Sequence, residues 1–505
     1  MSKAKALALE AIGLSKQFGP VKALVDVAMK VPAASFHALL GENGAGKSTL
    51  VKCVMGYYRP DDGAVLVDDR EREIANPRVA HDLGIGMVYQ HFTLVPAMSV
   101  AENLVMGRSH VPAIIDWKAE RRALDAFMAR MPFAVPLDAP VASLAAGEKQ
   151  KVEILKQLYL DRRLLILDEP TSVLTPAEAD EVLGMLRDRV RSGQLTVLMI
   201  THKFREVMAF ADEVTVLRRG RLAGAGIVSE LTTADLSELL IGSEQIPQSA
   251  AKTVRMNADE RLQIRDLVAE DDAGAVAVDG VNLAVCSGEI VGIAGVSGNG
   301  QSELMQVLAG QREPRQGEIR VHGEPYGRTR MEMSAHKVFC LPEEPLRNAC
   351  VAPMNVAENL AFRIFDQPRY AAGGWWLNRT ALRQRARELI QRYRIKTPSP
   401  EVPIATLSGG NVQRTVLARE LSGEVEVLIV ANPCFGLDFL AVAEIRAQIV
   451  AARNRGVAVL LLSEDLDEIL ELSDRVFVMF EGRLVYETAI GEADLGTIGA
   501  RMAGH

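Results

Sequence analysis

The sequence predicts an α/β fold that occurs twice, with a mostly parallel sheet at the centre of each copy. Several motifs recur in the same order in the two halves of the 505-residue chain. An apolar run at 36–40 leads into a glycine-rich loop that is followed by a helical pattern. Continuous apolar runs at 164–167 and 427–430 are typical of strands that are covered on both faces. Together these patterns predict parallel strands that alternate with helices.

The internal repeat is a duplicated domain. The loop Gly41-Glu-Asn-Gly-Ala-Gly-Lys-Ser-Thr-Leu50 aligns with Gly295-Val-Ser-Gly-Asn-Gly-Gln-Ser-Glu-Leu304 at a shift of 254 residues. Further along, Leu167-Asp-Glu-Pro170 lies opposite Val430-Ala-Asn-Pro433, at a shift of 263. Because the matches keep their order while the shift drifts by only a few residues, chance similarity of glycine-rich turns does not explain them.

We expect one domain over residues 1–242, a linker over 243–260 and a second domain over 261–505. The linker is polar and has no sustained apolar period, which is typical of a surface connection. Each domain is expected to contain short β-like runs, a buried strand before the glycine-rich loop and a helical middle. These segments are 6–12, 36–40 and 117–131 in the first half, and 262–268, 290–294 and 380–394 in the second.

Composition excludes several classes of protein. Hydrophobic residues make up 48% and charged residues 24%, which excludes wholesale disorder. The net charge of −8 gives no sign of a protein that is held to nucleic acid by phosphate contacts. No apolar stretch is long enough to span a membrane, and Glu10 interrupts the first apolar run too early for a signal peptide. Five cysteines without CxxC spacing indicate reduced thiols and no metal or disulfide framework.

The first glycine-rich loop carries a complete nucleotide-binding motif of the form G-x-x-x-x-G-K-[ST]. Its glycines let backbone N–H groups curl around phosphate oxygens, and the helix that follows adds its positive dipole end. We expect Lys47 to reach the β- and γ-phosphates of ATP and the Ser48 hydroxyl to ligate Mg²⁺. The predicted ATP-binding residues of this loop are Gly41, Asn43, Gly44, Gly46, Lys47, Ser48 and Thr49.

Acidic and imidazole groups follow two later strands of the first half. The apolar run 164–167 ends in Asp168 and Glu169, and the run 198–200 is followed by His202. Asp168 is expected to hold Mg²⁺ through its water shell, and Glu169 to orient or deprotonate the water that attacks the γ-phosphate. A neutral His202 would hydrogen-bond the γ-phosphate or that water. Taken alone, an acidic pair after a strand also suits a helix cap, and a lone histidine also suits a structural role.

These residues together resemble the ATP-binding cassette (ABC) family of ATPases, over nearly the whole chain. The resemblance implies tandem P-loop NTPase domains, each with an N-terminal antiparallel β part and a helical subdomain. It assigns Phe18 to adenine stacking, and His202 to the switch histidine. Gln90 matches the Q-loop glutamine, which touches Mg²⁺ and signals to the membrane partner. Ser172-Val-Leu-Thr175 lies where the family has its D-loop.

The resemblance also implies a signature loop that works in trans, because two cassettes pack head to tail around each ATP. The second half has Leu407-Ser-Gly-Gly-Asn411, a close match to the family's LSGGQ. In the first half the segment Leu144-Ala-Ala-Gly-Glu148 carries Ala145 where the hydroxyl belongs. The predicted ATP-binding residues of the intact signature are Ser408, Gly409, Gly410 and Asn411.

The second half has lost the residues that bind and hydrolyse ATP. Its replacements remove the cation, the metal carboxylate, the general base and the switch imidazole. Its segment Leu341-Pro-Glu-Glu-Pro-Leu-Arg-Asn-Ala-Cys350 departs from the family's PEDR-type sequence, which bears on the permease contact of the second half. In a head-to-tail pair all the losses fall in one composite site, so we expect one hydrolytic and one degenerate site, formed within one chain. The replacements are Gln301 for Lys47, Ala431 for Asp168, Asn432 for Glu169 and Glu464 for His202, with Asp272 opposite Phe18.

The resemblance implies an importer for simple sugars or nucleosides. Its expected partners are two integral-membrane permease subunits and, indirectly, an extracytoplasmic solute-binding protein, with the chain peripheral to the cytoplasmic face of the inner membrane. No nucleic acid is expected as a partner. Two alternatives stay open: a soluble tandem-cassette ATPase acting on ribosomes or nucleic acid, and a regulatory module that binds ATP without hydrolysing it.

Overall fold

The computed structural model describes residues 5–108, 111–242, 251–253, 259–296, 298–372, 376–437, 439–502 and 504. It divides into two compact units, Met1–Gln245 and Ile246–His505. Most of the linker expected over 243–260 lies outside the described residues. Among those that are described, no helix is long and apolar enough to cross a bilayer.

Unit 1 is built on a mostly parallel sheet. Within its described residues a six-stranded sheet has the order β10-β9-β3-β8-β7-β6, in which only β10 runs antiparallel to its neighbour. An antiparallel sheet of order β2-β1-β4-β5 accompanies it. The strands are β1 (Leu9–Phe18), β2 (Val21–Val31), β3 (Phe36–Gly41), β4 (Asp62–Val67), β5 (Arg70–Glu71), β6 (Ile85–Val88), β7 (Leu164–Asp168), β8 (Thr196–Ile200), β9 (Glu213–Arg218) and β10 (Arg221–Ile227).

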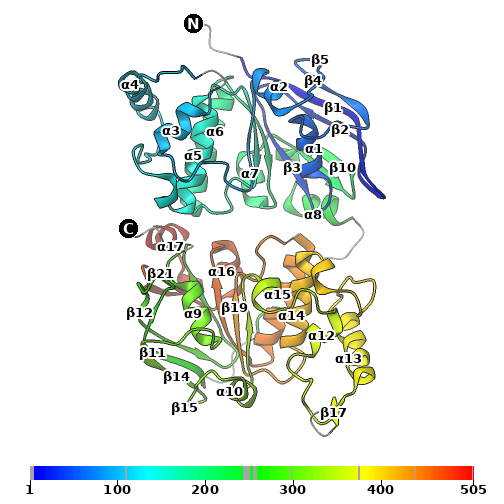
Figure 1. Cartoon of the computed structure of the whole chain (residues 1–505), viewed down its shortest axis with the longest axis vertical. Coiled ribbons are helices and arrows are strands. Elements are labelled where there is room, and N and C mark those ends of the chain that lie inside the picture. The colour runs from blue at the N-terminus through cyan, green and yellow to red at the C-terminus, as the bar shows by residue number, and fades with distance from the viewer. Residues whose placement is uncertain are drawn as a thin grey trace. The chain divides into compact units, whose positions relative to one another are not determined.

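The helices of unit 1 fall into two groups. Helix α1 lies beside the antiparallel strands, whereas α3, α4 and α5 gather on the other side of the central sheet (Figure 1). This second group is the helical subdomain that the resemblance implies. The helices are α1 (Lys47–Val54), α2 (Pro77–Asp82), α3 (Val100–Met106), α4 (Trp117–Met128), α5 (Ala146–Tyr159), α6 (Pro176–Arg191), α7 (Phe204–Phe210) and α8 (Thr233–Ile241).

The two larger sheets of unit 2 correspond to those of unit 1, and its described residues add a two-stranded sheet of β17 and β18. In its described part the central sheet has the order β16-β19-β20-β13-β21-β22, and an antiparallel sheet has the order β12-β11-β14-β15. Both units therefore confirm the predicted α/β fold. The strands are β11 (Glu260–Glu270), β12 (Val276–Cys286), β13 (Ile290–Ala294), β14 (Gln316–Val321), β15 (Glu324–Pro325), β16 (Val338–Leu341), β17 (Ala371–Ala372), β18 (Trp376–Leu377), β19 (Val427–Ala431), β20 (Ala458–Ser463), β21 (Arg475–Phe480) and β22 (Arg483–Ala489).

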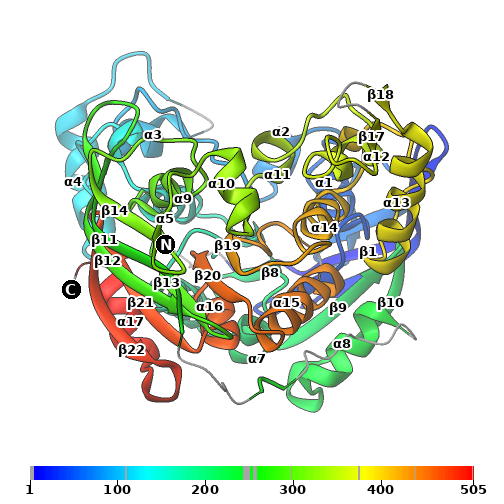
Figure 2. The ribbon, with the colours of Figure 1, turned by 90° about the horizontal axis from the view of Figure 1, so that it is seen from below.

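The helices of unit 2 are again divided between two sides. Figure 2 shows α9 beside the antiparallel strands, and α12, α13 and α14 across the central sheet from them. The helices are α9 (Gln301–Leu308), α10 (Arg330–Ala335), α11 (Pro345–Asn348), α12 (Val356–Ala361), α13 (Arg379–Arg392), α14 (Gly409–Glu420), α15 (Phe439–Asn454), α16 (Leu466–Leu472) and α17 (Leu495–Met502).

The apolar runs of the sequence become the buried strands of the central sheets. Every residue of β13, β19 and β20 is buried, as are the first four of β7. The predicted helix over 117–131 is shorter, because α4 ends at Met128. Its first turn is capped by the Asp116 carboxylate, which accepts hydrogen bonds from the N–H groups of Lys118 and Ala119.

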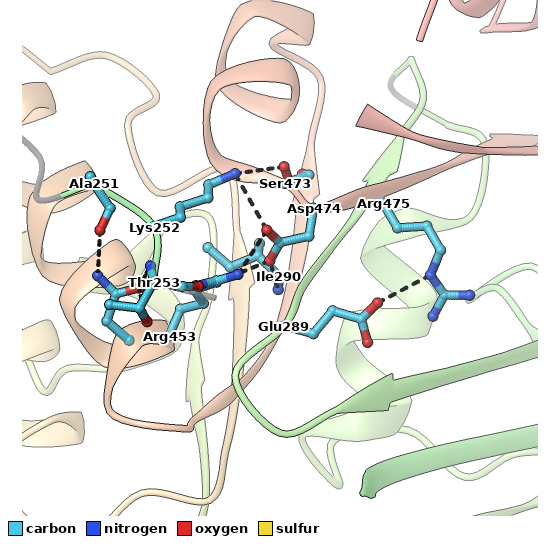
Figure 3. Close-up of polar contacts among 10 residues, drawn as sticks. Ala251, Lys252, Thr253, Glu289, Ile290, Arg453, Ser473, Asp474 and Arg475 are labelled. Atoms are coloured by element: carbon cyan, nitrogen blue, oxygen red, sulfur yellow. Dashed lines mark hydrogen bonds and ion pairs between the residues drawn. The ribbon is translucent and has the colours of Figure 1, made fainter. Parts of the chain in front are cut away.

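The described segment Ala251–Thr253 is fastened to unit 2 (Figure 3). The Asn454 side chain donates to the carbonyl of the segment's first residue at 3.0 Å and accepts from the N–H of its last residue at 3.1 Å. Arg453 donates to the carbonyl of that last residue at 2.6 Å and to both carboxylate oxygens of Asp474 at 3.1 Å. Asp474 in turn accepts from the N–H of Ile290, so the segment is tied to the first residue of β13.

The buried histidine of β3 makes the stability of unit 1 depend on pH. His37 is 2% exposed, and its Nε2 atom lies 2.8 Å from Thr215 Oγ1. Burial lowers its pKa from 6.5 to about 4, against the opposing charge of Asp212. The unfolded chain therefore binds this proton more readily than the folded chain does. The contribution of the neutral His37 to the free energy of unfolding is fully present above pH 6.5 and is lost as the pH falls toward 4.

We expect the free energy of unfolding of unit 1 to fall by about 2 kcal/mol between pH 7 and pH 5 through His37 alone. His37→Gln removes this contribution, so its denaturation curves should change less with pH than those of the wild type. The exposed His91→Gln is the matched control and should keep the wild-type dependence. Equal pH dependence in wild type and His37→Gln would show that another group titrates.

Candidate active site

The phosphate loop of unit 1 requires glycine at defined positions. Gly44 and Gly46 have φ angles of 80° and 102°, in the left-handed region that favours glycine. A Cβ atom at Gly46 would lie 2.7 Å from the Ala23 carbonyl oxygen, so only glycine allows the loop to close against β2. Helix α1 begins directly afterwards at Lys47, and therefore its first N–H groups lie at the end of this loop.

Lys47 is folded back over the start of the loop. Its Nζ atom donates to the carbonyl oxygens of Gly41 at 2.5 Å and Glu42 at 3.1 Å. These bonds hold the Lys47 ammonium group close to the backbone N–H groups of the loop, which are suitable donors to phosphate oxygens. The residues predicted to bind phosphate thus lie in one loop at the start of α1, with the Lys47 ammonium group beside its backbone.

The three predicted side chains that follow β6, β7 and β8 meet at one edge of the sheet. Gln90 Nε2 donates to Glu169 Oε2 at 3.3 Å, and His202 Nδ1 lies 3.2 Å from Glu169 Oε1. Glu169 has a φ of 49°, and its N–H donates to the Ile200 carbonyl at 2.9 Å. The carboxylate is therefore held on both oxygens, and its backbone is fixed to the neighbouring strand.

The two adjacent carboxyl groups have opposite pKa shifts. Burial and the neighbouring charge of Glu169 raise the pKa of Asp168. Burial opposes the ionisation of Glu169, but the hydrogen bond to His202 and the charges around it, including that of Lys47, outweigh burial and lower its pKa. Glu169 thus stays ionised, as an acceptor of protons must be. Asp168, Ser48 and Gln90 are oxygen ligands of the kind that Mg²⁺ takes, and the excess negative charge suits a divalent cation.

Phe18, the predicted adenine contact, is 42% exposed at the end of β1. Tyr58 packs edge-on against it with ring centroids 5.0 Å apart, and Lys16 Nζ lies 5.7 Å from its centroid. The ring thus contacts Tyr58 and Lys16 while much of its surface stays exposed to solvent, as stacking on a planar base requires. Sequence reasoning did not identify Tyr58 as the support.

The signature segment of unit 2 is preorganised by a residue that was expected to contact ATP. Asn411 is 8% exposed, and its Nδ2 atom donates to Ser408 Oγ at 2.8 Å. Its Oδ1 atom accepts from Lys396 N at 2.8 Å and from Arg414 Nη1 at 3.1 Å. Asn411 therefore fixes the orientation of the Ser408 hydroxyl at the start of α14.

In unit 2 the equivalent positions keep the backbone geometry of unit 1 but carry different side chains. Asn432 has a φ of 41°, and its N–H donates to the Leu462 carbonyl at 2.8 Å, as Glu169 does in unit 1. Its Oδ1 atom accepts from Glu464 N at 2.9 Å. Gln301 is 9% exposed and donates to the Ile293 carbonyl at 2.8 Å.

Unit 2 also carries a carboxyl group that sequence reasoning did not assign to the site. Glu343 occupies the place of Gln90 at a shift of 253 residues, and it lines the same small cavity as Gln301 and Glu464. Burial raises the pKa of Glu343, against the hydrogen bond from Asn432. The described lining of this cavity contains two carboxyl side chains and no lysine. The available signal was the departure of 341–350 from the family's pattern.

Comparison with known proteins shows which chains are similar to this one. The model of the family described as "ABC transporter" matches residues 24–172 and 278–434. The nucleoside import ATP-binding protein NupA of Lactococcus lactis is 37% identical, over 94% of each chain. The glucose import ATP-binding protein TsgD13 of Haloferax volcanii is 39% identical, over 97% of this chain and 94% of its own. A solved structure of RNase-L Inhibitor shares the fold with a TM-score of 0.66 at 19% identity, over 96% of this chain and 93% of its own.

We expect Lys47→Met to weaken MgATP binding by roughly 10- to 100-fold, because a charge-assisted contact to phosphate contributes about 1.5–3 kcal/mol. Gln301→Met, at the equivalent position of unit 2, should leave the measured affinity within about twofold. Equilibrium binding of a fluorescent ATP analogue to each purified variant measures both. A large loss from Gln301→Met would mean that the second loop binds nucleotide as well.

Proposed function

The chain belongs to the ABC transporter family of ATPases, and from that premise we propose that it energises import of a small polar solute through separate permease subunits. The printed functions of NupA and TsgD13 support a nucleoside or a simple sugar as the solute. The proposed partners are two integral-membrane permease subunits and, indirectly, an extracytoplasmic solute-binding protein. The chain then acts at the cytoplasmic face of the membrane, as a peripheral subunit.

In the proposed reaction, Glu169 orients the attacking water and accepts its proton. The observation that supports this role is that Gln90 Nε2 and His202 Nδ1 contact the two carboxylate oxygens of Glu169, at 3.3 and 3.2 Å. His202 hydrogen-bonds the γ-phosphate or the water, and Lys47 neutralises charge on the β- and γ-phosphates. Mg²⁺, held by Asp168, Ser48 and Gln90, supplies electrostatic stabilisation of the phosphates.

We further propose that one of two composite sites hydrolyses ATP. The first unit contributes its phosphate loop and carboxylates, and the second contributes Ser408, Gly409 and Gly410, with Asn411 holding the Ser408 hydroxyl. The degenerate site would combine Gln301, Asn432 and Glu464 with the segment that contains Ala145. Pairing of first units from two chains would set intact phosphate loops against that altered segment, which favours pairing within one chain.

Glu169→Gln should lower the ATPase rate by about 10²- to 10⁴-fold, because it removes the proton acceptor while keeping the shape of the side chain. Asn432→Gln is the matched control, since both residues follow a buried strand with a positive φ. It should leave the rate nearly unchanged. Steady-state phosphate release checks both variants. Undiminished turnover in Glu169→Gln would contradict the assigned role.

The transport role is tested by adding partners to the purified chain. Stimulation of ATP hydrolysis by permease subunits in lipid nanodiscs is the expected result. Stimulation by ribosomes instead would favour the soluble alternative, and the absence of turnover under every condition would favour a regulatory ATP-binding module. The wild type and Asn432→Gln should respond alike, whereas Glu169→Gln should not respond.

A further inference from the structure

Helix α5 holds both ends of the segment that carries Gln90. On the strand side of this segment, the buried Gln157 donates from Nε2 to the Met87 carbonyl at 3.1 Å. On its other side, Thr93 donates from its N–H and its hydroxyl to Glu153. The two attachments lie one turn apart on α5, and the chain from 87 to 93 passes between them.

Glu153 is the centre of the second attachment. Its side chain is 1% exposed, and its carboxylate oxygens lie 2.8 and 3.0 Å from Thr93 Oγ1. Lys156 completes the group, with Nζ 2.9 Å from Glu153 Oε2 and 2.9 Å from Thr93 Oγ1. A buried carboxylate that is paired and hydrogen-bonded in this way holds its partners firmly, because losing either partner leaves a buried charge uncompensated.

Unit 2 holds the corresponding segment by other groups. On α14, Val416 stands in place of Glu153 at a shift of 263 residues. Arg419 of the same helix donates from Nη1 to the Ala349 carbonyl at 2.8 Å and pairs with the buried Glu420 at 2.6 Å. Among the described residues, a buried carboxylate bound to a threonine of this segment is thus a feature of unit 1.

We propose that Glu153 is a positioning residue that keeps Gln90 within reach of Glu169 by tying Thr93 to α5. The inference rests on the proposed function, in which Gln90 contacts the metal and the catalytic carboxylate. Thr93 is three residues from Gln90, so release of Thr93 lets the intervening backbone move. The Gln90–Glu169 contact is already long at 3.3 Å, and a small displacement breaks it.

Kinetics of three variants test the positioning role. Thr93→Val keeps the shape and the N–H but removes the hydroxyl, Thr93→Ser keeps the hydroxyl, and Glu153→Gln removes the charge. We expect Thr93→Val and Glu153→Gln each to lower kcat by roughly tenfold, with KM for ATP within about twofold, since the lost bond contributes about 1–1.5 kcal/mol to alignment. Thr93→Ser should retain wild-type turnover. Because the two residues act as a unit, the double variant Thr93→Val/Glu153→Gln should be no slower than the slower single variant.

Hydrogen exchange of the peptide containing 88–94 provides a readout that does not depend on hydrolysis. It should become faster in Glu153→Gln, because the Thr93 amide loses a charged acceptor. Unchanged exchange overturns the attachment, and faster exchange with kcat within twofold of the wild type overturns the positioning role. A kcat loss with additive effects in the double variant also overturns it. An inactive wild type would instead contradict the proposed function, while the exchange measurement still decides whether Glu153 holds the segment.

Discussion

The site of unit 1 depends on one constraint, which is that three neighbouring parallel strands end at the same edge of a buried sheet. Strands β6, β7 and β8 are paired in register, so the residues that follow them converge. Glu169 turns at a positive φ and gives its N–H to the end of β8, which places its carboxylate between Gln90 and His202. Side chains that are 33 and 79 residues from Glu169 in sequence thereby act on one functional group.

The strand ends of unit 2 have the same geometry, but the charged side chains of unit 1 are replaced there. Asn432 adopts the same positive φ and makes the same backbone bond as Glu169, and Gln301 stands at the start of α9 as Lys47 stands at the start of α1. The fold therefore does not require the charged groups. What changes is the electrostatics, since a lysine and a carboxylate pair are replaced by amides and an alanine, while Glu343 adds a half-buried carboxyl group. The backbone geometry at this strand end is therefore the same with and without the charged side chains.

The sequence predicts most of the fold and the local part of the site. The strands at 164–167 and 290–294 and the loop before Lys47 follow from short-range patterns, because burial on both faces and the glycine spacing are visible in the sequence. Three side-chain contacts could not be predicted, because they depend on tertiary packing. They are those of Tyr58 with Phe18, of Asn411 with Ser408 and of Thr93 with Glu153. The end of α4 at Met128 was missed for a smaller reason, since apolar periodicity continues through Met131 beyond the last helical turn.

Helix α5 lacks the signature hydroxyl at its start but keeps the side chains that hold the segment with Gln90. Its first residue follows Ala145, which has no hydroxyl, and the hydroxyl of the equivalent Ser408 makes no capping bond to α14 either. At the start of α5 the Glu148 carboxylate accepts from the Ala145 N–H at 2.9 Å. The helix therefore still starts at the same residue, and Glu153, Lys156 and Gln157 keep their places two to three turns further along. Loss of the signature hydroxyl in unit 1 is thus compatible with an intact Gln90 segment in the same unit.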